Sequence, residues 1–192
     1  FKVLQRSFFN FDGNAYAGDQ QANFYNESLA QNASATYPLA SLGAYVQVNP
    51  TSEVSFAVGA QDANNVSGES IEFDTFGDGP WAWFGYAQWT PAFKGLGSAQ
   101  YSLIYYEQPS VPAQPESTSG WSFNAVQNLD DKWGLFARAN ASTGSVAAIE
   151  RSIAGGVIMN DPLGRNPDDQ LGFGLAWNKT NKSAFPGVAT GD

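Results

Sequence analysis

Apolar and polar residues alternate along most of the chain, in segments of about nine or ten residues that end at turn residues. In residues 81–89, Trp81 and Trp89 fall on one face of an extended chain, and Phe84 and Gln88 fall on the other. An antiparallel sheet with one apolar and one polar face has this pattern. It predicts strands over residues 42–48, 54–61, 81–89, 99–107, 121–126, 133–140, 151–159 and 170–178, with a ninth near 3–11.

Turns and loops separate these segments. Pro50 follows Asn49 in the short link between the first two, at the position where a β-turn favours proline. Longer loops are expected at residues 12–36, which include a short helix, at 62–80 and at 108–118. The sequence shows no heptads and no long amphipathic helix, so we expect a single all-β, antiparallel β-barrel domain over residues 1–192.

The two predicted faces differ in a way that favours a membrane. Small residues fill the middle of the apolar faces, and tryptophans stand near the strand ends. Tryptophan favours a membrane–water interface because its ring is apolar and its N–H is polar. The predicted membrane-interface aromatics are Trp81, Trp89, Trp121, Trp133 and Trp177. A soluble extracellular β-sandwich with one wet face stays open as the alternative, because its strands would alternate as well.

Composition narrows the chemistry. The chain has no Cys and no His, which excludes a Ser-His-Asp triad, a disulfide framework and a thiolate metal site. The chain has nine basic residues and a net charge of -9, which argues against binding to nucleic acid. Acidic pairs such as Asp130-Asp131 and Asp168-Asp169 read as turn residues rather than as metal ligands. Glu69 and Glu72 lie in a Gly/Ser-rich stretch and do not favour a glycosidase pair. We therefore expect that the protein is not an enzyme and that it binds no cofactor and no metal ion.

Length sets the size of the expected barrel. A barrel with an aqueous channel needs about 16 strands, and this chain supplies about eight or nine. The sequence therefore predicts either a small filled barrel or part of a larger transmembrane barrel, and we favour the second.

Short stretches support this interpretation by resemblance. Three stretches resemble strands of the carbohydrate-selective porins of the OprB type. They are residues 37–50, the strand at 133–139 and residues 155–178, which include Gly164-Arg165-Asn166-Pro167. The resemblance covers about residues 37 to 178. It implies a barrel of about sixteen strands in the bacterial outer membrane, passive diffusion and a preference for sugars.

Passive transport requires polar groups and aromatic surfaces along the lumen rather than a catalytic residue. Alternation predicts these pore-lining residues: Arg138, Asn140, Asn124, Gln47, Gln88, Tyr86, Tyr106 and, if its strand begins there, Arg151. Expected partners are the lipid bilayer and small sugars or other polar solutes, with homo-oligomerisation left open. The remaining alternatives are a soluble glycan-binding sandwich and an outer-membrane barrel with a plugged lumen.

Overall fold

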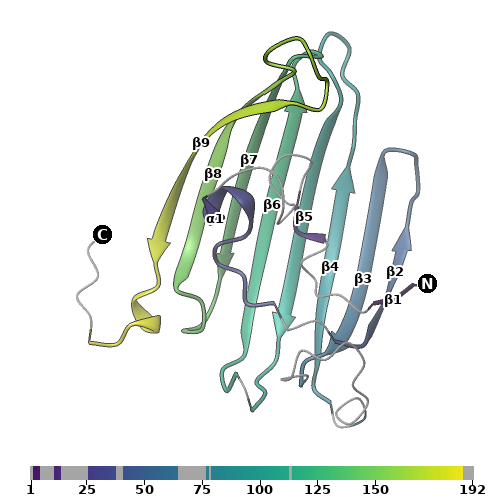
Figure 1. Ribbon diagram of the computed structural model, residues 1–192. Helices are drawn as coiled ribbons and strands as arrows, with labels where there is room; N and C mark the ends of the chain where they lie inside the picture. Colours follow the sequence, from purple (N-terminus) through teal and green to yellow (C-terminus); the bar gives the residue numbers. More distant parts are fainter. Residues whose placement is uncertain are drawn as a thin grey trace.

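The computed structural model describes residues 2–4, 11–13, 26–37, 41–64, 77, 79–112 and 114–187. They form one sheet of nine strands, in which every strand is antiparallel to the next in the chain (Figure 1). The strands are β1 (Lys2–Leu4), β2 (Gly43–Val48), β3 (Val54–Asp62), β4 (Trp81–Trp89), β5 (Ala99–Gln108), β6 (Thr118–Asn128), β7 (Trp133–Ser142), β8 (Ile149–Asn160) and β9 (Gln170–Thr180). Two short helices, α1 (Glu27–Ala30) and η2 (Lys182–Ala184), complete the elements. The predicted all-β, antiparallel class is confirmed.

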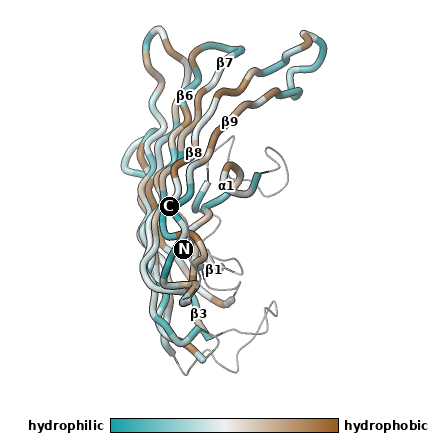
Figure 2. Tube along the Cα trace, turned by 90° about the vertical axis from the view of Figure 1, so that its left-hand side faces the viewer, coloured by the Kyte–Doolittle hydropathy of each residue, from teal (hydrophilic) through white to brown (hydrophobic). Residues whose placement is uncertain are grey.

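The sheet is open and curved. Strands β1 and β9 are its two edges, and neither pairs with a second strand among the described residues. Helix α1 lies against the concave side, in front of β6 to β8 (Figures 1 and 2). The ninth strand, expected near 3–11, is described only as β1, because residues 5–10 lie outside the described part of the chain. Most of the predicted loop at 62–80 also lies outside it.

One face of the sheet, called the apolar face below, is bare. The pairing register aligns Val46, Val58, Tyr105 and Trp121 in one row across β2 to β6. Side chains on this face stay exposed, and Leu175 reaches 70%. Water-soluble domains rarely expose so large a continuous apolar surface, which is the surface that lipid would cover.

The opposite, concave face, called the polar face below, is covered over part of its area. Residues 26–37, named the inner segment here, and Asp12 pack against it. Leu29 of the inner segment contacts a small apolar cluster that includes Phe136 and Ile158. The described residues thus cover part of the polar face and leave the apolar face bare, which is the reverse of a soluble sandwich.

No helix in the described ranges is both long and apolar enough to cross a membrane.

Candidate pore-lining site

Strand register brings most of the predicted lining residues to the polar face. One cross-strand row runs from Gln47 through Ala57 and Tyr86 to Ile104, Ser122 and Asn140. The next row runs from Gln88 through Ser102 and Asn124 to Arg138. Tyr106 stands two residues beyond Ile104 in β5 and so points the same way.

Arg138 lies at the centre of this face and is only 1% exposed. Its Nε donates a hydrogen bond of 2.6 Å to Oδ1 of Asn124. The amide of Asn124 in turn donates to Oδ1 of Asp12 at 2.9 Å. A buried guanidinium is tolerated only with polar and charged partners, and here a bridging amide links it to a carboxylate that is itself 1% exposed.

Asp12 collects donors from both the wall and the inner segment. Asn32 donates to Oδ2 of Asp12 at 2.9 Å, and the hydroxyl of Tyr37 donates to the same oxygen. Burial, reinforced by the Asp12 carboxylate, raises the pKa of the Tyr37 phenol well above its ordinary value. Tyr37 therefore stays protonated and remains a donor. Asp12 joins the inner segment to Asn124 of β6.

Further hydrogen bonds attach the inner segment to other strands. Ser34 donates to Asn140 of β7 at 2.9 Å. The backbone N–H of Thr36 donates to the Tyr106 hydroxyl at 3.1 Å, and the Thr36 hydroxyl lies 2.8 Å from that of Thr118. Asn178 of β9 donates to Ser28 at 2.7 Å. The segment is thus held against β5, β6, β7 and β9, and it narrows the space in front of the sheet.

Gln47, Gln88 and Tyr86 lie outside this covered region. Gln47 is exposed, and its amide donates to the side chain of Asn49 at 3.1 Å. Gln88 is half-buried and accepts a hydrogen bond of 3.4 Å from Ser55. The ring of Tyr86 packs edge-on against Phe11, with centroids 5.2 Å apart. These wall residues therefore do not belong to the network around Asp12.

Sequence reasoning missed Asp12 and the polar side chains of the inner segment. Residues 12–36 had been predicted as a loop, and a loop has no periodicity that assigns its side chains to a face. The only available signal was the density of hydrogen-bonding residues in Asn32-Ala33-Ser34-Ala35-Thr36.

The placement of Arg151 on the polar face was wrong. Strand β8 begins at Ile149, two residues earlier than expected, and its register with β9 is irregular between Ile149 and Arg151. Arg151 pairs with Ala141, which pairs with Trp121, so it lies on the apolar face. Its side chain is 61% exposed and ion-paired to Glu150 at 3.1 Å.

The five predicted interface tryptophans all project from the apolar face and are exposed; they are Trp81, Trp89, Trp121, Trp133 and Trp177. Trp81 opens β4 and Trp89 closes it, and Trp133 opens β7. Trp89 contacts Phe93 and Tyr101, with ring centroids 5.8 and 5.7 Å apart. Aromatic side chains thus stand at both ends of the strands with aliphatic ones between them. That arrangement is typical of a lipid-facing barrel wall.

Among the side chains that the structure describes, no cluster of three or more carboxylates could hold a metal ion.

Comparisons with known proteins agree with this architecture. A family model described as "Carbohydrate-selective porin, OprB family" matches residues 4–190. Two proteins named Porin AaxA, from Chlamydia pneumoniae and Chlamydia abortus, are 40% and 42% identical to the chain over 186 and 177 residues. These alignments cover 97% and 92% of this chain but 42% and 39% of those proteins. The chain therefore spans about two fifths of the length of the curated relatives it matches.

A solved structure of Pseudomonas putida OprB, determined at high pH, has the same fold with a TM-score of 0.58 at 19% identity. That match covers 76% of this chain and 41% of the other. The family description and the names of the relatives are those of channels rather than of enzymes. Because the family model matches nearly the whole chain, the chain belongs to the OprB family of carbohydrate-selective porins.

Proposed function

We propose that the complete protein is an outer-membrane porin through which small polar solutes, chiefly sugars, diffuse passively, without a catalytic step or a cofactor. The observation that carries this proposal is the reversed burial of the sheet. Leu175 on the apolar face is 70% exposed, whereas Arg138 on the polar face is 1% exposed. An apolar face left bare for lipid, opposite a face of polar side chains, is the distribution of a barrel wall.

The polar face divides into two functional parts. Arg138, Asn124 and Asn140 lie beneath the inner segment, so we assign them to holding that segment in place rather than to solute contact. Gln47 and Gln88 lie outside the covered region, and their amides offer both donors and acceptors to sugar hydroxyls. The inner segment then sets the width of the passage, and the uncovered wall contributes to its selectivity.

Single-channel recording tests the channel function. The full-length protein, purified in detergent and added to a planar bilayer, is expected to produce stepwise conductance increases. The same protein in liposomes is expected to admit neutral sugars, measured by osmotic swelling. Absence of both signals would reject the porin and favour a barrel plugged by its inner segment.

A matched pair of variants tests the sugar preference of the wall. Gln47→Ala combined with Gln88→Ala is expected to slow sugar entry relative to the conductance of a small salt. Val58→Ala, on the apolar face of the same sheet, serves as the control and should leave both rates unchanged. Equal sugar entry in the double variant and the control would remove these two residues from the selectivity assignment. A detergent-free, monodisperse full-length protein would instead favour the soluble sandwich.

A further inference from the structure

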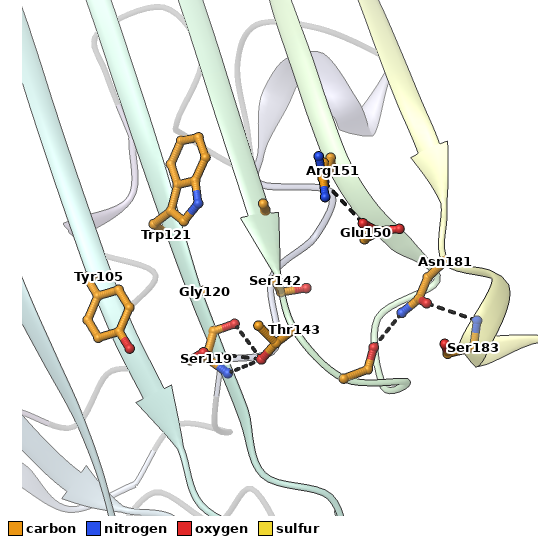
Figure 3. Close-up of a pocket in the computed structure, with 12 residues that line it drawn as sticks. Tyr105, Ser119, Gly120, Trp121, Ser142, Thr143, Glu150, Arg151, Asn181 and Ser183 are labelled. Carbon is orange, nitrogen blue, oxygen red and sulfur yellow. Dashed lines mark hydrogen bonds and ion pairs between the residues drawn. The ribbon is translucent and has the colours of Figure 1, made fainter.

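A groove opens on the apolar face near the edge of the sheet where β5 and β7 end and β6 and β8 begin. This face is opposite the one that the inner segment covers. It has a volume of about 730 Å³, and its lining includes Tyr105, Trp121, Thr143, Glu150 and Arg151 (Figure 3). A second groove of about 580 Å³ adjoins it and shares Glu150 and Asn181 with it. The passage of solutes through the lumen uses neither groove.

Basic side chains gather in these two grooves. Arg151 of β8 lies directly opposite Lys179 of β9. Both contact the same carboxylate: Nε of Arg151 is 3.1 Å from Oε1 of Glu150, and Nζ of Lys179 is 3.0 Å from Oε2. Lys182 lines the second groove. Arg151, Lys179 and Glu150 together carry a formal charge of +1.

This charge is opposite in sign to that of the chain, which carries -9 overall. The basic cluster therefore does not follow from a generally basic surface. The single carboxylate of Glu150 cannot neutralise both Arg151 and Lys179, and the Arg151 side chain remains 61% exposed and the Lys179 side chain 41% exposed. The cluster retains donors for an external anion.

The position of the cluster identifies the kind of anion. Arg151 belongs to the cross-strand row that contains Trp121 and Tyr105, on the face that we assign to lipid. Aromatic side chains at strand ends lie at the level of lipid headgroups, where a cation on the lipid face is far less costly than at the bilayer centre. The anions at that level are headgroup phosphates, and the planar guanidinium fork of arginine matches them.

The lengths of the connections between strands indicate which leaflet of the outer membrane the grooves face. The connections at this end of the sheet are residues 5–42, 63–80, 109–117 and 143–148, and they are longer in total than those at the other end, residues 49–53, 90–98, 129–132 and 161–169. Barrels of this class place their longer loops outside the cell and their short turns in the periplasm. We propose that the two grooves, which we name the outer basic site, bind a phosphate of lipopolysaccharide in the outer leaflet. This inference rests on the proposed function, because it requires the sheet to stand in an outer membrane.

Lipid titration of the full-length protein tests the site. The protein in detergent micelles is titrated with diphosphorylated lipopolysaccharide and, separately, with the enzymatically dephosphorylated lipid, and bound lipid is counted by native mass spectrometry. A cation near an anionic surface contributes roughly a five-fold increase in affinity. Arg151→Gln with Lys179→Gln is therefore expected to weaken binding of the phosphorylated lipid by roughly thirty-fold.

Arg165→Gln is the matched control, because Arg165 is also an exposed arginine ion-paired to a carboxylate, Asp169, at 3.4 Å, but at the opposite end of the sheet. It should bind lipid as the parent protein does. The single variant Arg151→Gln, with roughly a five-fold loss, replaces the double variant if the latter fails to fold. Equal affinity of the Arg151 variants and Arg165→Gln, or equal binding of the dephosphorylated lipid, would overturn the proposal.

Conductance of the same samples separates the two proposals. Normal channels with phosphate-independent lipid binding would reject the outer basic site and leave the porin intact. Phosphate-dependent binding that is lost in the Arg151 variants, without any conductance, would support the outer basic site and reject the porin.

Discussion

The carboxylate of Asp12 is expected to control whether the inner segment stays against the wall. Asp12 accepts hydrogen bonds from Asn124 of β6, at 2.9 Å, and from Asn32 and Tyr37 of the inner segment. Asp12→Asn keeps the shape of the side chain but replaces one acceptor oxygen with a donor. At least one of the three donors then loses its acceptor, and the other two lose a charged partner.

The size of the effect follows from these bonds. A hydrogen bond to a charged group contributes about 1.5–3 kcal/mol, against about 0.5–1.5 kcal/mol for a neutral pair. One bond lost and two weakened, next to the buried Arg138, give a loss of about 3 kcal/mol. Since about 1.4 kcal/mol corresponds to a factor of ten, the population with a detached inner segment should rise roughly a hundredfold.

A cysteine reporter measures that population. The chain contains no Cys, so Ser122→Cys introduces a single thiol in its sequence, at a side chain that is 0% exposed on β6. Labelling of this thiol by a maleimide requires the inner segment to leave the wall. We expect Asp12→Asn to accelerate labelling strongly and to increase the single-channel conductance, while the barrel remains resistant to detergent.

Asp62→Asn provides the control, because Asp62 is a buried carboxylate that accepts from the backbone of Asn64 and lies outside the Asp12 network. It should leave labelling at the rate of the reporter protein alone. If Asp12→Asn labels no faster than Asp62→Asn, the assignment of Asp12 as the group that fixes the inner segment is refuted.

Three further predictions concern the wall and its rim. Val46→Arg places a cation on the apolar face and should reduce folding into lipid vesicles by about 2 kcal/mol, measured by denaturant titration. Gly120→Ala should destabilise the fold by about 1–3 kcal/mol, because its new Cβ would lie 2.5 Å from the Tyr106 hydroxyl, and a lowered thermal unfolding temperature checks this. Hydrogen bonds from Ser145 lower the pKa of Glu116. The stability that these bonds add is therefore present at neutral pH and is lost as the pH falls below the ordinary glutamate pKa of about 4.3. Hydrogen exchange at the Ser145 amide measures this loss.

Each of these changes has a neighbouring control. Gln47→Arg differs from Val46→Arg by one residue but points to the polar face, and it should fold into vesicles normally. Gly85→Ala meets nothing within 4 Å and should have little effect, so equal losses at Gly85 and Gly120 would contradict the packing argument. Glu116→Gln should abolish the acid-induced change in exchange; its persistence would assign the effect to another group.

The wall of the barrel was readable from the sequence, because strand alternation is a local signal. The strand predicted over 81–89 is β4 from end to end, and the turn after Asn49 joins β2 to β3 as expected. The prediction was wrong at Arg151, which has the same parity along β8 as Ile153 and therefore lies with it on the apolar face.

The network at Asp12 was not readable, because it joins residues that are far apart in the chain. Asn124 and Asp12 are 112 residues apart, and Asn140 and Ser34 are 106 apart. No periodic pattern reports such contacts. Composition indicated only that the loop is polar, and its docking onto the wall depends on the curvature of the whole sheet.

Burial on the polar face has a consequence for how selectivity can evolve in this wall. Side chains beneath the inner segment, such as Arg138 and Asn140, are constrained by hydrogen bonds to Asn124 and Ser34, so under the proposed function a change there would alter the width of the passage through the segment. Side chains outside it, such as Gln47, have few protein partners and can change without disturbing the fold. Under the proposed function, width and chemical preference would therefore be set by different residues on one face of the same sheet, and each could be varied while the other is held constant.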